Sequence, residues 1–318
     1  MNGIQPPTGS TDEAHVAFIG ATGRSGSTLL SRLMGSMPGV CSVGELCWLW
    51  AYGVLGNRNC GCGQAFSDCP FWTSVGSRAF GGFDHVDARR MNDLRRSLTK
   101  NRTVPELLVH ARQETRSDVA EYASVMGPLY RAILAESGAT VVVDNSKQAA
   151  VAMLARDTPG VRLSLVHLVR RSHGVAYSWT KHVERSDKTG AEMRRRGPAR
   201  TAVRWTVDNA LYELLGSTGS PRLLVRYEDL MTDAEAQIAG IIDFLGLPDD
   251  AAAALFTDDG RVNISMDHSV WGNPMRLRQG PETLRPDTAW RDELDVRSRR
   301  LVTTLSAAGL ARYGYPLR

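Results

Sequence analysis

The stretch that decides the fold is HVAFIGATGRSGST, residues 15–28. Its first six residues form a short apolar run that stops at Gly20, which is typical of a buried strand. From Ser27 onward, apolar residues recur at helical spacing as far as Met37, and a Pro-Gly pair then ends the pattern. The stretch therefore predicts a strand over 15–20, a glycine-rich turn, and a helix over 27–37.

Further along the chain, apolar runs with the length of buried strands alternate with helical segments. We expect strands at 140–144, 163–169 and 223–227, and helices at 105–136, 149–156, 174–185 and 199–216. Strands that alternate with helices indicate a parallel sheet with helices on both faces. The prediction is an α/β fold with a P-loop-type parallel sheet.

We expect a single domain over residues 15–318, preceded by a disordered N-terminus at 1–14. Insertions on the acceptor side are expected at about 47–135 and 180–200, with a mobile loop at 186–200.

Composition limits the possible functions. The chain has 318 residues, 42% hydrophobic and 23% charged, as is ordinary for a globular protein. Lys plus Arg total 38 and Asp plus Glu 34, and the net charge of +4 gives no reason to expect a nucleic-acid partner. No apolar run approaches the roughly 18 residues of a membrane span. The polar start is unlike a signal peptide, and five cysteines, an odd number, fit a reducing compartment. We expect a cytoplasmic protein, and the sequence indicates no oligomeric state.

The glycine-rich turn has the features of a phosphate-binding loop. Between a strand and a helix, successive backbone N–H groups can point at an anion, and the helix dipole favours negative charge there. The turn departs from a Walker A loop, because Ser27 stands where that loop has its lysine and Arg24 lies two residues before Gly26. We predict a phosphate site that is not that of an ordinary nucleotide triphosphatase. A purely structural turn is the alternative.

The turn resembles the 5′-phosphosulfate loop of the sulfotransferases that use 3′-phosphoadenosine 5′-phosphosulfate (PAPS), in which a basic residue precedes Ser-Gly-Ser/Thr-Thr. A second segment, LVRRSHGVAYS at 168–178, resembles the 3′-phosphate site of that family, an Arg at a strand end and a Ser eight residues later. By this resemblance Arg170 and Ser178 bind the 3′-phosphate; an Arg and a Ser on a solvated helix start are the alternative. The resemblance covers roughly residues 15–295 and implies the sulfotransferase fold.

Two later segments follow in the family's order. RYEDL at 226–230 resembles the segment whose aromatic residue contacts adenine, so Tyr227 is a candidate stacking residue, although a half-buried Tyr fits equally well. HSVWGNPMR at 268–276 resembles the C-terminal cofactor loop of the bacterial and carbohydrate-type branch. It lacks the Arg-Lys-Gly triplet of the cytosolic aryl branch. The PAPS-binding residues implied by the resemblance are Arg24, Ser25, Gly26, Ser27, Thr28, Leu29, Arg170, Ser178, Tyr227, Gly272, Asn273 and Arg276.

Sulfuryl transfer to a hydroxyl needs a base on the acceptor. The protein-tyrosine and bacterial glycan branches use a glutamate just after the first helix, in a Gly-Glu context, and Glu45 has this context here. The resemblance implies Glu45 as the general base; a Glu in a surface loop is the alternative. His173, His182 and His268 are rival bases, of which His173 lies inside the 3′-phosphate segment.

The reaction also needs cations near the leaving phosphate oxygen. Lys147 follows a predicted strand, where ligands bind in open α/β sheets. In the glutamate-using branches a lysine in this position acts on the leaving oxygen, so the resemblance implies Lys147 and Arg24 as catalytic cations. A solvent-exposed lysine at a helix start is the alternative.

Four of the five cysteines lie within 23 residues: Cys47, Cys60, Cys62 and Cys69. Zinc bound by their thiolates, small buried residues packing an insertion, and a disulfide formed on isolation are all open, although Cys-x-Cys is not the usual knuckle. No acidic cluster suggests a magnesium site. We predict no metal site and no metal requirement for the chemistry.

The sequence thus predicts a sulfotransferase that moves the sulfuryl group of PAPS to a hydroxyl of a small-molecule, glycan or natural-product acceptor, with a role in bacterial secondary metabolism. An atypical P-loop kinase or nucleotide-binding protein and a non-catalytic PAPS-binding scaffold are the alternatives. The tryptophans at 48, 50, 72 and 179 either form an apolar wall of the acceptor pocket or belong to the hydrophobic core. The arginines at 194–196 either attract an anionic acceptor or lie in a solvated loop.

Overall fold

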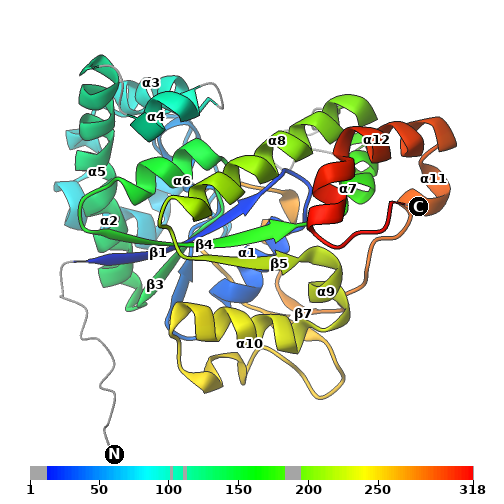
Figure 1. Ribbon diagram of the computed structural model, residues 1–318. Coiled ribbons are helices and arrows are strands. Elements are labelled where there is room, and N and C mark those ends of the chain that lie inside the picture. The colour runs from blue at the N-terminus through cyan, green and yellow to red at the C-terminus, as the bar shows by residue number, and fades with distance from the viewer. Residues whose placement is uncertain (1–12, 101–102, 110–112, 183–194, 318) are drawn as a thin grey trace, which may run out of the picture.

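The computed structural model describes residues 13–317, apart from 101–102, 110–112 and 183–194. In this part of the chain a five-stranded parallel sheet lies at the centre, in the order β2-β3-β1-β4-β5 (Figure 1). A second sheet pairs β6 with β7 in antiparallel orientation. The strands are β1 (Ala14–Ala21), β2 (Val40–Ser42), β3 (Val141–Asp144), β4 (Val161–Val169), β5 (Arg222–Arg226), β6 (Val262–Ile264) and β7 (Gly280–Glu282).

The helices are α1 (Ser27–Gly35), α2 (Pro70–Phe80), α3 (Ala88–Leu98), α4 (Val104–Val109), α5 (Gln113–Ser137), α6 (Ala149–Arg156), α7 (Ser172–Thr180), α8 (Pro198–Ser217), α9 (Tyr227–Thr232), α10 (Ala234–Leu245), α11 (Trp290–Glu293) and α12 (Val296–Arg312). α5, α6 and α8 cover one face of the central sheet, and α1 and α10 cover the other (Figure 1). This confirms the predicted α/β fold. Within the described ranges, no helix combines the length and the apolar character needed to cross a lipid bilayer.

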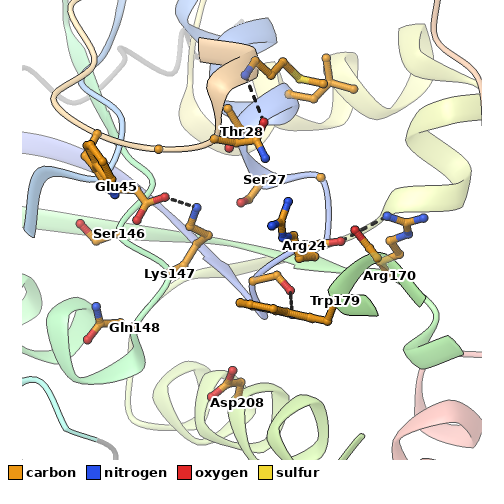
Figure 2. Close-up of a pocket in the computed structure, with 18 of the residues that line it drawn as sticks. Arg24, Ser27, Thr28, Glu45, Ser146, Lys147, Gln148, Arg170, Trp179 and Asp208 are labelled. Carbon is orange, nitrogen blue, oxygen red and sulfur yellow. Dashed lines mark hydrogen bonds and ion pairs between the residues drawn. The ribbon is translucent and has the colours of Figure 1, made fainter. Parts of the chain in front are cut away.

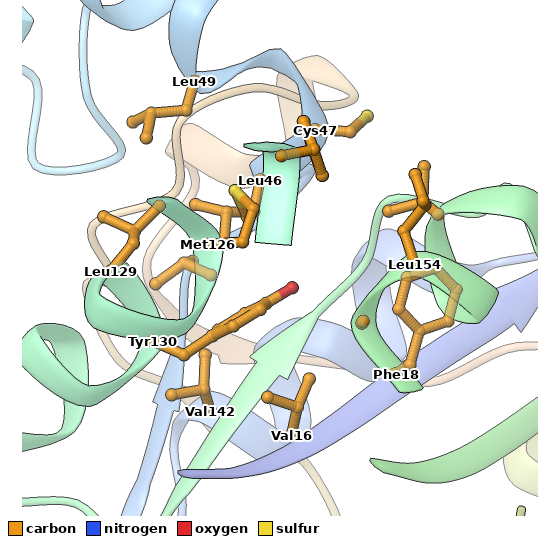
Figure 3. Packing of buried hydrophobic residues seen from close by; sticks show 14 of the residues in the cluster. Val16, Phe18, Leu46, Cys47, Leu49, Met126, Leu129, Tyr130, Val142 and Leu154 are labelled. Atoms are coloured by element: carbon orange, nitrogen blue, oxygen red, sulfur yellow. The ribbon is translucent and has the colours of Figure 1, made fainter. Parts of the chain in front are cut away.

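Both faces of β1 are buried, so the strand divides its side chains between two cores. Val16 and Phe18 pack with residues of α5 and α6 (Figure 3). Ala17 and Ile19 pack with residues of α1 and α10 on the other face. A strand covered on both sides has a continuous apolar sequence, which is why it could be predicted.

Some boundaries differ from the predictions. The three-residue strand β2 was missed, because so short a run carries no periodicity. The helix predicted over 174–185 ends at Thr180 as α7, and the predicted helix 105–136 corresponds to α4 and α5. The mobile loop predicted at 186–200 lies mostly outside the described residues. The prediction is wrong for residues 198–200, because α8 starts at Pro198. Most of the predicted disordered start at 1–14 is likewise outside them, whereas Ala14 already belongs to β1.

The strand order decides where a ligand can bind. β1 lies between β3 and β4, and the three strands are parallel. The loops that follow them, at 22–26, 145–148 and 170–171, therefore meet at one edge of the sheet. In open α/β sheets ligands bind in the crevice at this carboxyl edge.

Gly20, near the end of β1, allows α8 to lie very close to the strand. A Cβ at this position would lie 2.7 Å from the ring of Tyr212 on α8 and 2.9 Å from Leu165 on β4. Any side chain at residue 20 would therefore push the helix outward.

Candidate active site

A cavity of about 470 Å³ opens at the carboxyl edge of the central sheet. Pockets that bind small molecules and cofactors have this size. Most of the predicted site residues line it: Arg24, Gly26, Ser27, Thr28, Leu29, Glu45, Lys147, Arg170, Ser178, Tyr227, Gly272 and Asn273. Ser25 and Arg276 are the predicted residues that do not.

The phosphate loop, residues 22–28, connects β1 to α1. The N–H of Ser25 donates to the carbonyl of Thr22 at 3.2 Å, and Gly26 has a φ of 91°, which favours glycine. A Cβ at Gly26 would also lie 2.6 Å from the ring of Tyr227. Among the described residues, the buried hydroxyls of Thr22 and Ser25 have no hydrogen-bond partner. Such hydroxyls beside a helix N-terminus suit an oxygen-rich anion.

Arg24 supplies a positive charge at this loop (Figure 2). Its φ of 76° is rare for a residue with a Cβ, and backbone strain of this kind concentrates at functional sites. Its guanidinium lies 5.3 Å from the centre of the Trp179 ring, and Trp179 Nε1 donates to the carbonyl of Gly23 at 2.9 Å. Burial lowers the pKa of Arg24, but a guanidinium stays protonated at neutral pH.

Arg170 directly follows β4 and lies to the right of Arg24 in Figure 2. Its side chain is buried, and its guanidinium lies 4.4 Å from the centre of the Tyr227 ring. Nη1 donates to the carbonyl of Arg24 at 3.2 Å, and Nη2 forms an ion pair with Asp287 at 3.2 Å. Arg170, which the sequence predicts to bind the 3′-phosphate, therefore already has an anionic partner in Asp287.

Asp287 was not predicted from the sequence. Burial opposes its ionisation, but the hydrogen bond from Lys181 and the charge of Arg170 outweigh burial and hold the pKa of Asp287 below its usual value. The carboxylate is therefore ionised at neutral pH and neutralises part of the charge that a phosphate would meet.

Glu45 and Lys147 form an ion pair on the other side of the cavity, at the left of Figure 2. Lys147 Nζ lies 2.5 Å from one carboxylate oxygen, and each side chain is 15% exposed. Trp48 Nε1 donates to the other oxygen at 3.2 Å, and the N–H of Glu45 donates to the carbonyl of Trp271 at 3.1 Å. Lys147 has a strained φ of 57°. A carboxylate and an ammonium group are thus held together beside the phosphate loop.

Buried Asp144, the last residue of β3, shapes the loop that carries Lys147. Its carboxylate accepts hydrogen bonds from the Tyr130 hydroxyl at 2.8 Å and from the N–H of Ser146 at 2.9 Å. The Ser146 hydroxyl accepts from the N–H of Cys47 at 2.9 Å. Desolvation raises the pKa of Asp144 to about 6, although these hydrogen bonds oppose the increase. The network links the two segments that carry the ion pair.

The C-terminal loop, residues 265–276, reaches the cavity through Gly272 and Asn273. Arg276, in the same loop, is 4% exposed and is not one of the residues that line the cavity. Its Nη1 donates to the carbonyl of Ser269 at 2.9 Å and its Nη2 to the carbonyl of Asn59 at 2.7 Å. Arg276 donates to two backbone carbonyls and so stabilises the loop, and its contact with a nucleotide stays a prediction.

Among the described residues, none of the three rival histidine bases lines the cavity. His173 is hydrogen-bonded to the Thr303 hydroxyl at 2.9 Å, and burial lowers its pKa to about 4. His182 contacts Arg195 at 2.8 Å. His268 lies among the cysteines. Of the predicted bases, only Glu45 reaches the cavity.

Two of the four tryptophans named from the sequence reach the cavity. Trp48 and Trp179 line the cavity, but Trp50 and Trp72 are fully buried core residues. Arg196 is a lining residue whose guanidinium lies 4.0 Å from the centre of the Trp179 ring, whereas residue 194 lies outside the described residues.

Sequence reasoning missed the contribution of α8. Arg204 and Asp208 line the cavity and form an ion pair, with Nε 2.7 Å from Oδ1. Their spacing of four residues was visible, but such pairs are common on any helix surface. Only the packing of α8 against β1 brings them to the site.

Solved structures relate this fold to known proteins. The sulfotransferase domain of the Synechococcus PCC 7002 olefin synthase matches over 100% of both chains, with a TM-score of 0.53 and 22% sequence identity. The chain has a sulfotransferase fold. The sulfotransferase domain from the curacin biosynthetic pathway has a TM-score of 0.49 and 16% identity, covering 96% of this chain and 99% of that one. A sulfotransferase from Alicyclobacillus acidocaldarius has a TM-score of 0.44 and 10% identity, covering 94% and 93%. No protein-family model matches the sequence, and no curated protein matches it.

Proposed function

We propose that this protein is a sulfotransferase that transfers the sulfuryl group of PAPS to a hydroxyl of a small-molecule, glycan or natural-product acceptor. The observation that carries the proposal is the arrangement of one cavity. The phosphate loop and Arg24 separate the Glu45–Lys147 pair from Arg170 (Figure 2). The fold shared with sulfotransferases supports the reaction class. We also propose that residues 15–318 act as one domain, since cavity residues extend from Gly23 to Met275.

The cavity suits a donor with two separated anionic groups. The phosphate loop and Arg24 would hold the 5′-phosphosulfate, because they offer helix N-terminal N–H groups, buried hydroxyls and a guanidinium. Arg170 and Ser178 would hold the 3′-phosphate. The Tyr227 ring borders both Arg170 and Gly26, and would contact the nucleoside between the two anions.

In the proposed reaction Glu45 accepts the proton of the acceptor hydroxyl. The acceptor oxygen forms its bond to sulfur while the bond from sulfur to the bridging phosphate oxygen breaks. Lys147 and Arg24 stabilise the negative charge that the leaving oxygen gains. Lys147 can contact Glu45 and the leaving oxygen together, because an ammonium group has three donors. Side chains supply this positive charge, so the chemistry needs no metal ion.

The test combines binding and turnover. Purified protein is titrated with the product nucleotide 3′-phosphoadenosine 5′-phosphate (PAP) by calorimetry, and labelled PAPS is supplied with cell-extract acceptors. We expect PAP to bind, label to reach an acceptor without added Mg²⁺, and Arg170→Ala to abolish PAP binding. Arg278→Ala is the matched control, because Arg278 is exposed and lies outside the cavity.

Two outcomes contradict the proposal. Preference for ATP with Mg²⁺ over PAPS would indicate a kinase or another nucleotide-binding protein. PAPS binding with no transfer to any acceptor would indicate a scaffold.

A further inference from the structure

Three cysteines and one histidine lie together beside the C-terminal loop. Cys60, Cys62 and Cys69 precede α2, and His268 belongs to the C-terminal loop. One potential ligand atom of each residue lies within 4.8 Å of the others. Cys47, which the sequence grouped with these cysteines, is not part of the cluster, and its sulfur accepts a hydrogen bond from Gln148.

The distances within the cluster are those between the ligands of a tetrahedral metal ion. The sulfur of Cys69 lies 3.7 Å from the sulfurs of both Cys60 and Cys62. His268 Nδ1 lies 3.6 Å from the sulfur of Cys60 and 3.4 Å from that of Cys69. Zn–S bonds of about 2.3 Å and a Zn–N bond of about 2.0 Å place two sulfurs about 3.8 Å apart, and sulfur and nitrogen about 3.5 Å apart. Four of the six ligand–ligand distances thus fit zinc, whereas a disulfide requires about 2.0 Å.

We propose that Cys60, Cys62, Cys69 and His268 bind one structural zinc ion. Four protein ligands complete a tetrahedral shell and leave no position for water or substrate, which is the pattern of structural zinc sites. The inference is independent of the proposed function, because none of the four residues lines the cavity.

Backbone groups around the sulfurs also fit metal-bound thiolates. The N–H of Cys62 is hydrogen-bonded to the sulfur of Cys60. The N–H of Trp72, in the first turn of α2, is hydrogen-bonded to the sulfur of Cys69. Donors of this kind stabilise thiolate ligands and orient them toward the metal.

Contacts to both the ring and the backbone hold His268 in place. Its ring stacks on Phe71, with centroids 4.5 Å apart and an interplanar angle of 11°. Its carbonyl accepts a hydrogen bond from Trp72 Nε1 at 2.9 Å. One residue later, the carbonyl of Ser269 accepts from the N–H of Gly61 at 2.9 Å.

Zinc at this place would tie the cysteine segment to the C-terminal loop. That loop continues directly to Trp271, whose carbonyl accepts the N–H of Glu45, and to Gly272 and Asn273 in the cavity lining. The metal would thus stabilise one wall of the cavity without taking part in chemistry there.

The first experiment measures metal on the full-length chain, purified without chelators or a metal-affinity column. We expect one zinc per chain by elemental analysis. Metal-free, reduced protein should take up Co²⁺ and develop the visible bands of tetrahedral cobalt together with sulfur-to-cobalt charge-transfer absorption. A protein that contains no zinc, and whose reduced form binds neither Zn²⁺ nor Co²⁺, overturns the proposal.

The second experiment identifies the ligands. Cys69→Ser should lose the zinc, whereas the matched variants Cys41→Ser and Cys47→Ser, outside the cluster, should keep it. His268→Cys should also keep zinc, with stronger charge-transfer absorption in the cobalt form because a fourth thiolate replaces the imidazole. The cobalt spectrum is recorded on the unmodified chain. It therefore tests for a metal site even if a substituted variant fails to fold. Retention of a full zinc equivalent by Cys69→Ser, or its loss from a folded Cys47→Ser, refutes the ligand set.

Discussion

The two sides of the cavity are built in different ways. The backbone turn of the phosphate loop is formed by residues close in sequence, with the N–H of Ser25 hydrogen-bonded to the carbonyl of Thr22 and a left-handed backbone at Arg24 and Gly26. Distant Trp179 and Arg170 add hydrogen bonds to its carbonyls. The side that holds the Glu45–Lys147 pair is assembled from three distant segments, joined by the Asp144 network and the C-terminal loop. A locally determined loop is recognisable as a motif, whereas an assembled side depends on tertiary contacts. The two sides should therefore respond differently to substitution.

The largest effect is expected on the assembled side. Glu45→Gln keeps the size of the side chain and removes the proton acceptor, so kcat should fall by about 10²–10⁴. PAP affinity should be unchanged, because the phosphate loop is intact. Steady-state kinetics and calorimetry measure the two quantities, with Glu235→Gln, at an exposed position of α10, as the control. Activity that survives Glu45→Gln excludes this residue as the base.

On the local side, Gly26→Ala should weaken PAP binding by about 100-fold, since displacement of binding groups by about 1 Å has effects of this order. The added Cβ meets the Tyr227 ring at 2.6 Å and adopts an unfavourable φ. Gly39→Ala is the control, because Gly39 also has a left-handed φ of 79° but its nearest neighbour is 3.5 Å away. If both variants lose affinity equally, the contact with Tyr227 is not the cause.

The support of the assembled side is tested by Arg276→Met. The change leaves the carbonyl of Asn59 without its donor, whereas the carbonyl of Ser269 keeps the N–H of Gly61, so the free energy of unfolding should fall by about 1–3 kcal/mol. Arg278→Met, two residues later and exposed, should change it little. Urea denaturation measures both. An unfolding free energy unchanged by Arg276→Met would mean that these hydrogen bonds do not stabilise the loop.

The smallest effect concerns the anion that occupies Arg170. Asp287→Asn removes the competing charge, and PAP should bind about fivefold more tightly, because a partly exposed ion pair is worth up to about 1 kcal/mol. Calorimetry at two salt concentrations measures the change, which should shrink at high salt. Asp292→Asn, on exposed α11, is the control. An unchanged PAP affinity would mean that breaking the ion pair between Asp287 and Arg170 costs no binding free energy.

The same contrast explains what the sequence could predict. β1, the phosphate loop and α1 were predictable, because apolar periodicity and glycine positions are local signals. Glu45, Lys147 and Arg170 were named from motifs, and the structure brings them to one cavity. Their roles remain predictions. Asp287, Arg204 and Asp208 could not be found, since only tertiary packing brings α8 and the segment around residue 287 to the site.

Arg276 and His268 show the converse. Both belong to a segment that the sequence identifies, but their side chains contact residues distant in sequence. Arg276 donates to the carbonyl of Asn59, and His268 lies beside three cysteine sulfurs. A motif indicates where the backbone runs, and the partners of each side chain depend on the neighbouring segments.

The close approach of α8 to Gly20 has a consequence for acceptor choice. Because the Tyr212 ring rests on bare backbone at Gly20, residue 20 has no side chain whose repacking could change the separation of helix and strand at this point. Asp208 and Arg204 lie about one and two turns before Tyr212 on that helix, so the close approach at Gly20 also fixes the depth of the cavity on this side. Adaptation to larger or smaller acceptors would then have to come from changes in these two side chains, not from movement of the helix.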